Sequence, residues 1–582
     1  MLALCFLMQS PVFAVSGRIV GRVIDAESGA ALPGANVYLK GTNIGAATDI
    51  EGEYAITGVP PGPYTLVVNY IGYGQQQVDI QVLPNQSTIQ DVKLDYTVLT
   101  GQDVVVTAQA RGQTEAINQQ VSARTIKNIV SSTKIQELPE ANAAEAVGRL
   151  PGVSLERSGG EGTKVMIRGM GAKYTKVQID GVDMAATGSG DRSADLSMIS
   201  PYMLEGIELT KSVMANQEAT ATGGIVNFKI KKAPDEPSFN VIAQGGYNNL
   251  RDTYKDFKVS VGGSRRFIAN MLGVYTQIDY EEKDAGSQQM GGISFTQENE
   301  TAPVRTNAMQ LMDIFRNVQR IGGTMVLDYN LPSTQIKSSN FFSRINREEI
   351  SHINSYGFTE QNFTLRYADT PNRSLTVFTN SLQIDHRWNN WDINSILSHS
   401  YSENILPRDV NSGNSNPPAN PFPADRKSDF NVNLNPETIP DLLAISLDDA
   451  VNFMHLGQIG HNENETRERD VSAELNLSNN LNLSDQINIK FSMGGKYRHK
   501  TKEFDTEGIV ISGQYYLDLV YENFNDQMSQ RSKDAWAADD QRLLLIDFLD
   551  NDYDGSGFMD GKYKFSRIMD SDMFRKIDEL AM

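Results

Sequence analysis

The strongest constraint on the fold is a two-residue alternation of apolar and polar side chains that begins after Pro237. Side chains along a β-strand point to opposite faces in turn, so this alternation predicts strands with one apolar face. Four segments show it clearly, with one face formed by Leu272, Val274, Thr276, Ile278 and Tyr280; by Trp391, Ile393, Leu397 and Tyr401; by Val471, Ala473, Leu475 and Leu477; and by Ile487, Ile489, Phe491, Met493 and Tyr497. A water-soluble sandwich would alternate as well, so two classes of β protein remain open.

The connections between the strands separate these two classes. Nine strands can be counted, starting near Phe239, Lys255, Ala269, Thr324, Gln335, Leu375, Asn390, Val471 and Ile487. The links after the second, fourth, sixth and eighth strands are short, at 263–267, 330–334, 386–389 and 479–486; those after the third, fifth and seventh are long, the last over about 402–470. All long links therefore fall at one end of an antiparallel sheet, which is typical of outer-membrane β-barrels and not of a secreted sandwich.

Composition agrees with this interpretation. The chain has 582 residues, which predicts several domains. Mean hydropathy is -0.38, and no apolar stretch after residue 14 approaches the roughly 18 residues that a spanning helix needs. A β-barrel is not excluded, because only alternate residues face lipid. The net charge of -20 excludes nucleic acid as a partner, since phosphates would be repelled.

The first 14 residues predict a signal peptide. An apolar core over residues 2–8 precedes Ala14, a small residue suited to signal-peptidase cleavage. The usual basic start is missing, which predicts a signal peptide truncated at its beginning. A buried terminal strand is the alternative. Cys5, the only cysteine, lies in this segment, so the mature chain would have no disulfide or thiol chemistry.

Residues 16–95 predict a small all-β sandwich, because short alternating segments are separated by turn signals. Expected strands cover 20–24, 35–39, 54–56 and 64–68, with a rigid turn at 60–63. The series Gly21, Val23, Asp25, Gly29, Gly41, Thr48, Gly52, Tyr54, Gly62 and Tyr73 resembles the carboxypeptidase regulatory-like family, which has a transthyretin-like fold. The resemblance implies a non-catalytic accessory domain.

Residues 111–232 predict an α+β domain. Ile126, Ile129 and Val130 have helical spacing, Asn142 is a candidate N-cap, and Ser200 with Pro201 predicts another helix start. Short strands are expected at 165–167 and 177–179. Four motifs resemble the plug domain of TonB-dependent outer-membrane receptors, and their central residues are Pro151 and Gly152, Arg168 and Gly169, Asp180 and Gly181, and Gly223 and Gly224. An ordinary α+β domain in which these glycines only shape turns is the alternative.

The linker at 96–110 contains a valine-rich segment. It consists of Asp103, Val104, Val105, Val106, Thr107 and Ala108. By itself such a segment is as typical of a buried strand, but between two domains it resembles a TonB box. An extended β-branched segment can add as a strand to a partner's sheet edge, which is how TonB would bind it.

Candidate catalytic residues are not found. No histidine precedes His352, and the sequence contains neither an H-E-x-x-H motif nor a phosphate-binding loop. Asp550, Asp552 and Asp554, with Gly555 in the sixth position, resemble the start of a calcium loop. Position twelve is Gly561 where glutamate is expected, which favours a solvated acidic turn and predicts no metal site.

These features predict a mainly β protein: an N-terminal β-sandwich, an α+β plug domain and, over 237–582, the first part of an antiparallel transmembrane β-barrel with long extracellular loops. The resemblance implies TonB-dependent uptake of a siderophore, oligosaccharide, cobalamin or peptide across the outer membrane of a Gram-negative bacterium, with the sandwich in the periplasm. Its implied partners are TonB, outer-membrane lipid and an unidentified small-molecule or oligosaccharide ligand, without a cofactor or catalysis. A secreted peptidase or adhesin with an accessory sandwich is the alternative.

The barrel should be incomplete. Residues 502–582 are acidic and turn-rich, with at most one further strand around 509–519 and a short helix over 574–582. Nine is an odd number of strands, whereas bacterial barrels of this type have an even number. We therefore expect a fragment of a longer receptor, with a partial curved sheet that has two unpaired edge strands.

Overall fold

The computed structural model describes residues 16–95, 120, 125–136, 142–301, 305–357, 362–415, 454–484 and 487–581, with interruptions at 27–28, 50, 71, 189, 213–217, 219, 298, 539–541, 562, 564 and 566–567. The expected signal peptide at 1–14 and the TonB-box-like segment at 103–108 lie outside these ranges. None of the helices in these ranges has the length and apolar character needed to cross a membrane.

The N-terminal sandwich consists of two small sheets. Sheet one contains β4 (Glu53–Val59), β1 (Gly17–Asp25), β7 (Ser87–Ile89) and β8 (Val92–Leu94). Sheet two contains β3 (Gly45–Ala47), β2 (Asn36–Leu39), β5 (Gly62–Asn69) and β6 (Gln76–Val82). Alternate residues such as Ile19, Val37 and Leu66 are fully or almost fully buried between the sheets, so the predicted all-β sandwich is confirmed.

The central domain, residues 125–232, contains a five-stranded mixed sheet in the order β13 (Val182–Asp183), β12 (Thr175–Ile179), β15 (Gly224–Ile230), β14 (Leu204–Thr210) and β9 (Lys127–Ser131). A hairpin of β10 (Val153–Ser158) and β11 (Glu161–Ile167) lies beside it, with α2 (Ser132–Gln136), α3 (Ala143–Gly148) and the 3-10 helices η1 (Ala172–Tyr174), η2 (Leu196–Met198) and η3 (Pro201–Met203). The Asn142 side chain accepts a hydrogen bond from the Glu145 amide, as an N-cap does.

One local prediction in this domain is wrong. Ile129 and Val130 belong to strand β9 and not to a helix, because β9 pairs with β14 in antiparallel register. The helical spacing of three apolar residues is a weak local preference, and the sheet edge of β14 overrides it. Ser200 precedes η3 as expected, but its hydroxyl donates to Asp279 of the large sheet and does not cap the helix.

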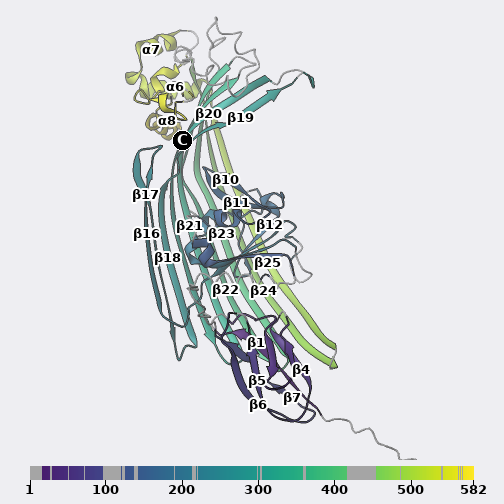
Figure 1. Ribbon diagram of the computed structural model, residues 1–582. Coiled ribbons are helices and arrows are strands. Elements are labelled where there is room, and N and C mark those ends of the chain that lie inside the picture. Colours follow the sequence, from purple (N-terminus) through teal and green to yellow (C-terminus); the bar gives the residue numbers. More distant parts are fainter. Residues whose placement is uncertain are drawn as a thin grey trace, which may run out of the picture.

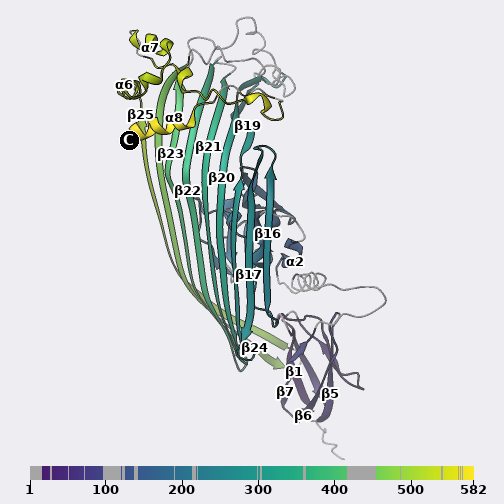
Figure 2. The same cartoon turned by 90° about the vertical axis from the view of Figure 1, so that its left-hand side faces the viewer.

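The large sheet is a single antiparallel surface of long strands (Figures 1 and 2). Its main path is β16 (Ser238–Asn248), β17 (Thr253–Phe267), β18 (Leu272–Asp284), β20 (Arg305–Asn330), β21 (Thr334–Gly357), β22 (Asn362–Trp388), β23 (Trp391–Ser415), β24 (His455–Ser484) and β25 (Ile487–Ile511). β19 (Ser287–Thr296) pairs with β20 off this path. Within the described ranges, β16 and β25 each pair with one neighbour, so the expected open, curved sheet is observed.

The strands on the main path match the nine predicted strands, but the predicted link lengths need correction. Residues 263–267 lie inside β17, and the turn follows at 268–271. The link expected to be long after the fifth strand is only 358–361, because β21 and β22 extend far past the segments with clear alternation. Ladder hydrogen bonds extend these strands even where the side-chain pattern becomes polar, so periodicity alone underestimates their length.

The two faces of the sheet differ as the alternation predicts. In β18, Gln277 and Asp279 are each 5% exposed against the central domain, whereas Ile278 between them is 62% exposed. Leu397, Leu475 and Met493 are similarly exposed on the same outward face. Both views show the central domain on the concave side of the sheet, with the sandwich at one end (Figures 1 and 2). The convex face of the sheet is thus apolar, and its concave face, which contacts the central domain, is polar.

Residues 514–581 form a helical cap at the opposite end, which the sequence did not predict. It contains α6 (Gln514–Phe524), η6 (Asn525–Gln527), α7 (Gln530–Ala537), η7 (Leu545–Phe548), η8 (Gly555–Gly557) and α8 (Ser571–Ala581). Only the terminal helix was expected; the additional strand around 509–519 is wrong, because β25 ends at Ile511 and α6 follows. Phe548, Phe558 and Phe574 of the cap pack with Leu311 of β20 and Tyr367 of β22, and these residues belong to one hydrophobic core.

Candidate functional site

The glycine-containing motifs of the central domain form tight turns, one of which contacts the large sheet. Arg168 and Asp180 have φ values of 55° and 50°, and the glycines that follow them, Gly169 and Gly181, have φ values of 73° and 83°. Gly169 and Gly181 adopt the left-handed conformation without a Cβ clash, whereas Arg168 and Asp180 are non-glycine residues for which it is uncommon. A Cβ on Gly224 would lie 2.7 Å from the Thr210 carbonyl oxygen, so close strand packing excludes larger residues there.

Asp180 is the motif residue with the most contacts to the sheet. Its carboxylate accepts hydrogen bonds from Lys337 Nζ and Ser339 Oγ of β21, each at 2.8 Å, and its carbonyl oxygen accepts from Gln383 Nε2 of β22 at 2.8 Å. Burial by itself would raise the pKa of Asp180, but the Lys337 charge and these hydrogen bonds hold it below its usual range. Asp180 is therefore an ionised, buried contact between the central domain and the sheet.

Arg168 acts inside the central domain. Its guanidinium donates to the carbonyl oxygens of Thr222 and Gly223 at 3.1 and 3.2 Å. Those bonds hold the turn before β15 against the turn after β11. Arg168 and Gly223 thus shape the domain, whereas Asp180 connects it to the sheet.

A second buried contact centres on Glu161 at the start of β11. Arg320 of β20 pairs with its carboxylate, and Lys283 of β18 donates to it at 2.9 Å. Arg320 also donates to Glu281 at 2.8 Å, so charges on three strands meet here. Burial raises the pKa of Glu161, but the two cations outweigh it and lower that pKa to about 2.

The wall formed by β23, β24 and β25 binds the segment after β13 through main-chain groups. Ser400 Oγ donates to the Asp183 carbonyl oxygen and Ser402 Oγ to the Ala186 carbonyl oxygen, both at 2.6 Å. Glu468 accepts from the Ala186 amide at 2.8 Å, and Lys502 Nζ donates to the Gly188 carbonyl oxygen at 2.8 Å. Each of these four side chains therefore binds a backbone group of the central domain.

An ionic cluster lies at the β25 edge. Lys176 and Arg498 both contact Asp183 and Glu218, and Lys496 Nζ lies 2.9 Å from Glu218 Oε1. A cavity of about 350 Å³ adjoins the cluster and is lined by Lys173, Lys176, Arg192, Arg498 and Lys500 among others. Opposite charges here hold the central domain to the last strand of the path.

Sequence reasoning identified Asp180 but missed Glu161, Ser200, Ser400 and Ser402. Glu161 lies in a segment without a motif, and Ser200 was expected only as a helix start. Ser400, Ser402 and Asp279, in contrast, occupy the polar positions of the two-residue alternation. Those positions face the central domain. The polar half of the pattern was therefore the available signal.

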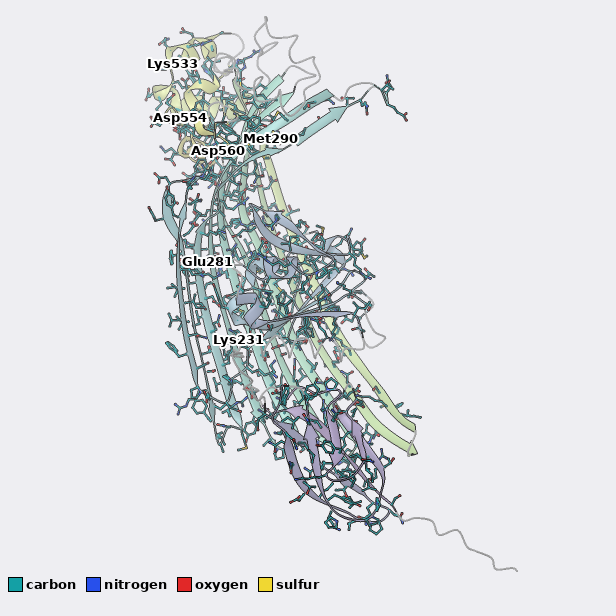
Figure 3. The ribbon with its side chains drawn as sticks, in the orientation of Figure 1. Lys231, Glu281, Met290, Lys533, Asp554 and Asp560 are labelled. Carbon is teal, nitrogen blue, oxygen red and sulfur yellow. The ribbon has the colours of Figure 1, made fainter. Side chains whose placement is uncertain are left out.

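The acidic motif at the C-terminal end lies in the cap (Figure 3). The Asp550 carboxylate accepts the Asp552 amide, and the Asp554 carboxylate accepts the Ser556 amide. Across the described parts of the chain, no group of three or more His, Cys, Asp or Glu side chains is arranged to hold a metal ion. Two of the three carboxylates are thus engaged with their own turn.

We predict that any calcium binding at this turn is weak. Without a carboxylate at position twelve, the dissociation constant should be no better than about 10⁻⁴ to 10⁻³ M. Titration calorimetry with calcium on the wild type and Asp552→Asn measures this. Micromolar affinity that the substitution abolishes would contradict the prediction.

Two family models match this chain. CarboxypepD_reg-like domain matches residues 19–106, and TonB-dependent Receptor Plug Domain matches residues 118–225. The first match extends into the TonB-box-like segment as far as residue 106. The second covers the motifs around Arg168, Asp180 and Gly224, of which Asp180 contacts the large sheet.

Curated relatives match over less than half of the chain. A TonB-dependent receptor of Formosa agariphila is 30% identical over 294 residues, which is 47% of this chain and 26% of that protein. The TonB-dependent receptor SusC of Bacteroides thetaiotaomicron is 26% identical, with the same coverage of 47% and 26%. The vitamin B12 transporter BtuB of Vibrio vulnificus is 30% identical over 26% of this chain and 24% of its own length. The matched region spans about a quarter of each relative.

Solved structures give a partial likeness. The ferric enterobactin receptor of Pseudomonas aeruginosa aligns over 66% of this chain and 59% of its own, with 14% identity and a TM-score of 0.38. The copper transporter OprC aligns over 66% and 60%, with 10% identity and a TM-score of 0.27.

The fold and the family matches define a class: a receptor-type protein in which a plug domain lies against a large antiparallel sheet. The chain carries a CarboxypepD_reg-like domain and a TonB-dependent receptor plug domain, and the curated relatives that it resembles include TonB-dependent receptors. The relatives described above are receptors and transporters rather than enzymes.

Proposed function

We propose that this protein takes part in TonB-dependent active uptake of a scarce solute across the outer membrane of a Gram-negative bacterium. The supporting observation is that the region matched by the plug model lies against the polar concave face of a sheet whose convex face is apolar. The apolar convex face suits contact with lipid, and the polar concave face suits a passage that the plug domain blocks. The solute is a siderophore, oligosaccharide, cobalamin or peptide.

The outward face supports placement in a membrane. On β20 the apolar outward residues extend from Ile321 to Tyr329, close to the roughly 9–11 residues that a transmembrane strand needs. Beyond them the outward positions become polar, at Gln319 and Asn317. We propose the orientation in which the cap lies on the extracellular side and the sandwich in the periplasm.

The contact between the central domain and the sheet suits a plug that must move. Ion pairs and hydrogen bonds through Glu161, Asp180 and Glu468 can be exchanged for bonds to water when the domain shifts. A purely apolar contact would expose surface at a cost that no water bond offsets. No observation favours the alternative of a peptidase or adhesin.

The experiment that tests the proposal concerns the segment Asp103–Ala108. If it is a TonB box, Val105→Pro removes a main-chain donor that strand addition to TonB needs. Affinity for the purified periplasmic domain of TonB from the same bacterium should fall about 5- to 150-fold, since an unmade buried hydrogen bond costs about 1–3 kcal/mol. Val105→Ile keeps both the donor and the β-branched side chain and is the matched control.

Calorimetry with that TonB domain measures the three affinities, and growth of the bacterium on limiting nutrients measures uptake. Equal TonB binding by the wild type and Val105→Pro would show that TonB binds elsewhere. No TonB binding by any of the three proteins would count against the proposed function itself.

A further inference from the structure

The N-terminal sandwich and the central domain are attached to the sheet in different ways. The central domain shares an apolar core with the sheet, in which Val326 and Phe341 of the strands pack with Phe228 of the central domain. The core of the sandwich consists, among the described residues, of sandwich side chains alone. A shared apolar core therefore attaches the central domain to the sheet, whereas the sandwich depends on other contacts.

Two ion pairs join the sandwich to the sheet in the described part of the chain. Lys490 Nζ lies 3.4 Å from Glu51 Oε1, and Arg387 Nη1 lies 3.8 Å from Asp91 Oδ2. Arg387 is among the last residues of β22, and Lys490 is among the first residues of β25. Figures 1 and 2 show the sandwich at this end of the sheet. The sandwich is thus docked through charged side chains.

The sandwich presents several carboxylates to these two cations. This acidic surface consists of Asp49, Glu51, Glu53 and Asp91. Burial and the neighbouring Asp49 carboxylate raise the pKa of Glu53, and the charges of Lys490 and Arg387 oppose that increase. Both cations of the sheet therefore act on the same group of carboxylates.

The register of the strands places both cations on the concave face. Gln383, an even number of residues before Arg387, donates to the central domain, and Arg498, an even number of residues after Lys490, also contacts the central domain. Residues at even spacing on one strand share a face. Asp392 accepts a hydrogen bond from Arg387 Nε at 3.1 Å, which orients the guanidinium. The sandwich is therefore docked on the concave side of the sheet, next to the central domain.

The two ion pairs are too exposed to hold the sandwich permanently. The side chains of Lys490 and Arg387 are 30% and 40% exposed. An exposed ion pair contributes a factor of about five or less to an equilibrium, and dissolved salt screens it. The Lys337 and Asp180 pair of the central domain is, in contrast, only 11% and 2% exposed. Docking of the sandwich is therefore weak and sensitive to salt, and attachment of the central domain is not.

We propose that the sandwich is a reversibly docked domain. The docking contact consists of its acidic surface with Arg387 and Lys490, and it holds the sandwich at the end of the concave face until ionic strength rises or a cation is lost. Because the sandwich and the central domain belong to one chain, a released sandwich stays tethered. This inference goes beyond the proposed function and does not depend on it.

Distances between spin labels test the proposal on the purified, full-length protein. The reporter pair is Ser87→Cys on the sandwich with Ser333→Cys on the sheet, and the control pair is Ser158→Cys on the central domain with Ser333→Cys. All three serines are exposed, and a Cys5→Ser background removes the native thiol. Double electron–electron resonance is measured at about 0.01 M and about 1 M salt, where the Debye lengths are about 30 Å and about 3 Å.

At low salt the reporter pair should give one narrow distance. At high salt the ratio of docked to released protein should fall about 5- to 25-fold, because two exposed ion pairs each contribute up to about fivefold. The control pair should stay narrow at both salt concentrations. A reporter distance that stays narrow at high salt would overturn the proposal, and so would one that is already broad at low salt. Broadening of the control pair would overturn it too, because salt would then act on the whole protein.

Charge variants at low salt provide the second measurement. Lys490→Glu should lower the ratio of docked to released protein at least about fivefold, because attraction becomes repulsion. Lys255→Glu makes the same change of charge at the cap end of β17 and should leave the reporter distance narrow. Lys490→Glu combined with Glu51→Lys restores opposite charges and should restore docking. Equal release in Lys490→Glu and in this exchange variant would overturn the assigned pairing.

Discussion

Replacing Asp180 with alanine should destabilise the attachment of the central domain to the sheet by about 3–5 kcal/mol, because it leaves the Lys337 ammonium buried without a counter-charge. The amide of Ile230 and the hydroxyl of Ser339 lose an acceptor as well. Hydrogen exchange should detect the loss as faster exchange at Gly181 and Ile230, and the urea midpoint of the domain should fall.

Two variants separate the charge from the packing. Asp180→Asn still accepts from Ser339 and should cost less than alanine does. Asp180→Leu combined with Lys337→Met removes both charges and should recover most of the lost stability, since a buried ion pair offers little over an apolar pair of similar volume. A loss of stability of no more than about 1 kcal/mol in Asp180→Ala would contradict the prediction, because the Asp180–Lys337 pair would then behave like an exposed surface pair.

Acid should weaken the attachment of the central domain to the sheet at the second buried contact, because Glu161 becomes protonated there. Its pKa is lowered from 4.5 to about 2, so the folded state favours the ionised form and the stabilisation is fully present above the unfolded pKa of 4.5. That stabilisation, on the order of 3 kcal/mol, is lost as the pH falls from 4.5 toward 2. We expect proteolysis of the central domain to accelerate over this range of pH.

Glu161→Gln is the matched variant, because it keeps the shape but cannot ionise. It should be less stable than the wild type at neutral pH and should lose less stability on acidification. A smaller acid dependence should remain, because the pKa of Glu218 at the opposite wall is also lowered to about 2. Parallel pH profiles for the wild type and Glu161→Gln would show that Glu161 does not carry the effect.

Repetitive and locally constrained features could be predicted from the sequence. The alternation around Ile278 places that residue outward and Gln277 inward, because successive side chains of any strand face opposite ways. The turns at Gly169 and Gly181 were also evident, since positive φ values select glycine. The sandwich, the nine strands of the main path and the plug motifs therefore follow from local rules.

Strand length and the cap depended on tertiary structure. β21 continues to Gly357 because β20 and β22 supply hydrogen-bond partners there, although its side chains no longer alternate in polarity. The helices of the cap form because the parts of β20 and β22 next to them offer an apolar surface, including Leu311 and Tyr367, on which the helices pack. A loop prediction has no access to a surface contributed by residues hundreds of positions away.

The candidate site also contains residues that could be predicted from the sequence and residues that only the tertiary structure identified. Asp180 could be identified because its turn has a sequence motif, but its partners Lys337 and Ser339 could not, since 157 and 159 residues separate them. Glu161, Ser200 and Ser402 are ordinary polar residues in sequence and acquire their roles only when the central domain lies on the concave face. The sequence alone determined which faces are apolar and where the chain turns, whereas long-range packing decided which charges meet, because burial and pairing depend on three-dimensional proximity.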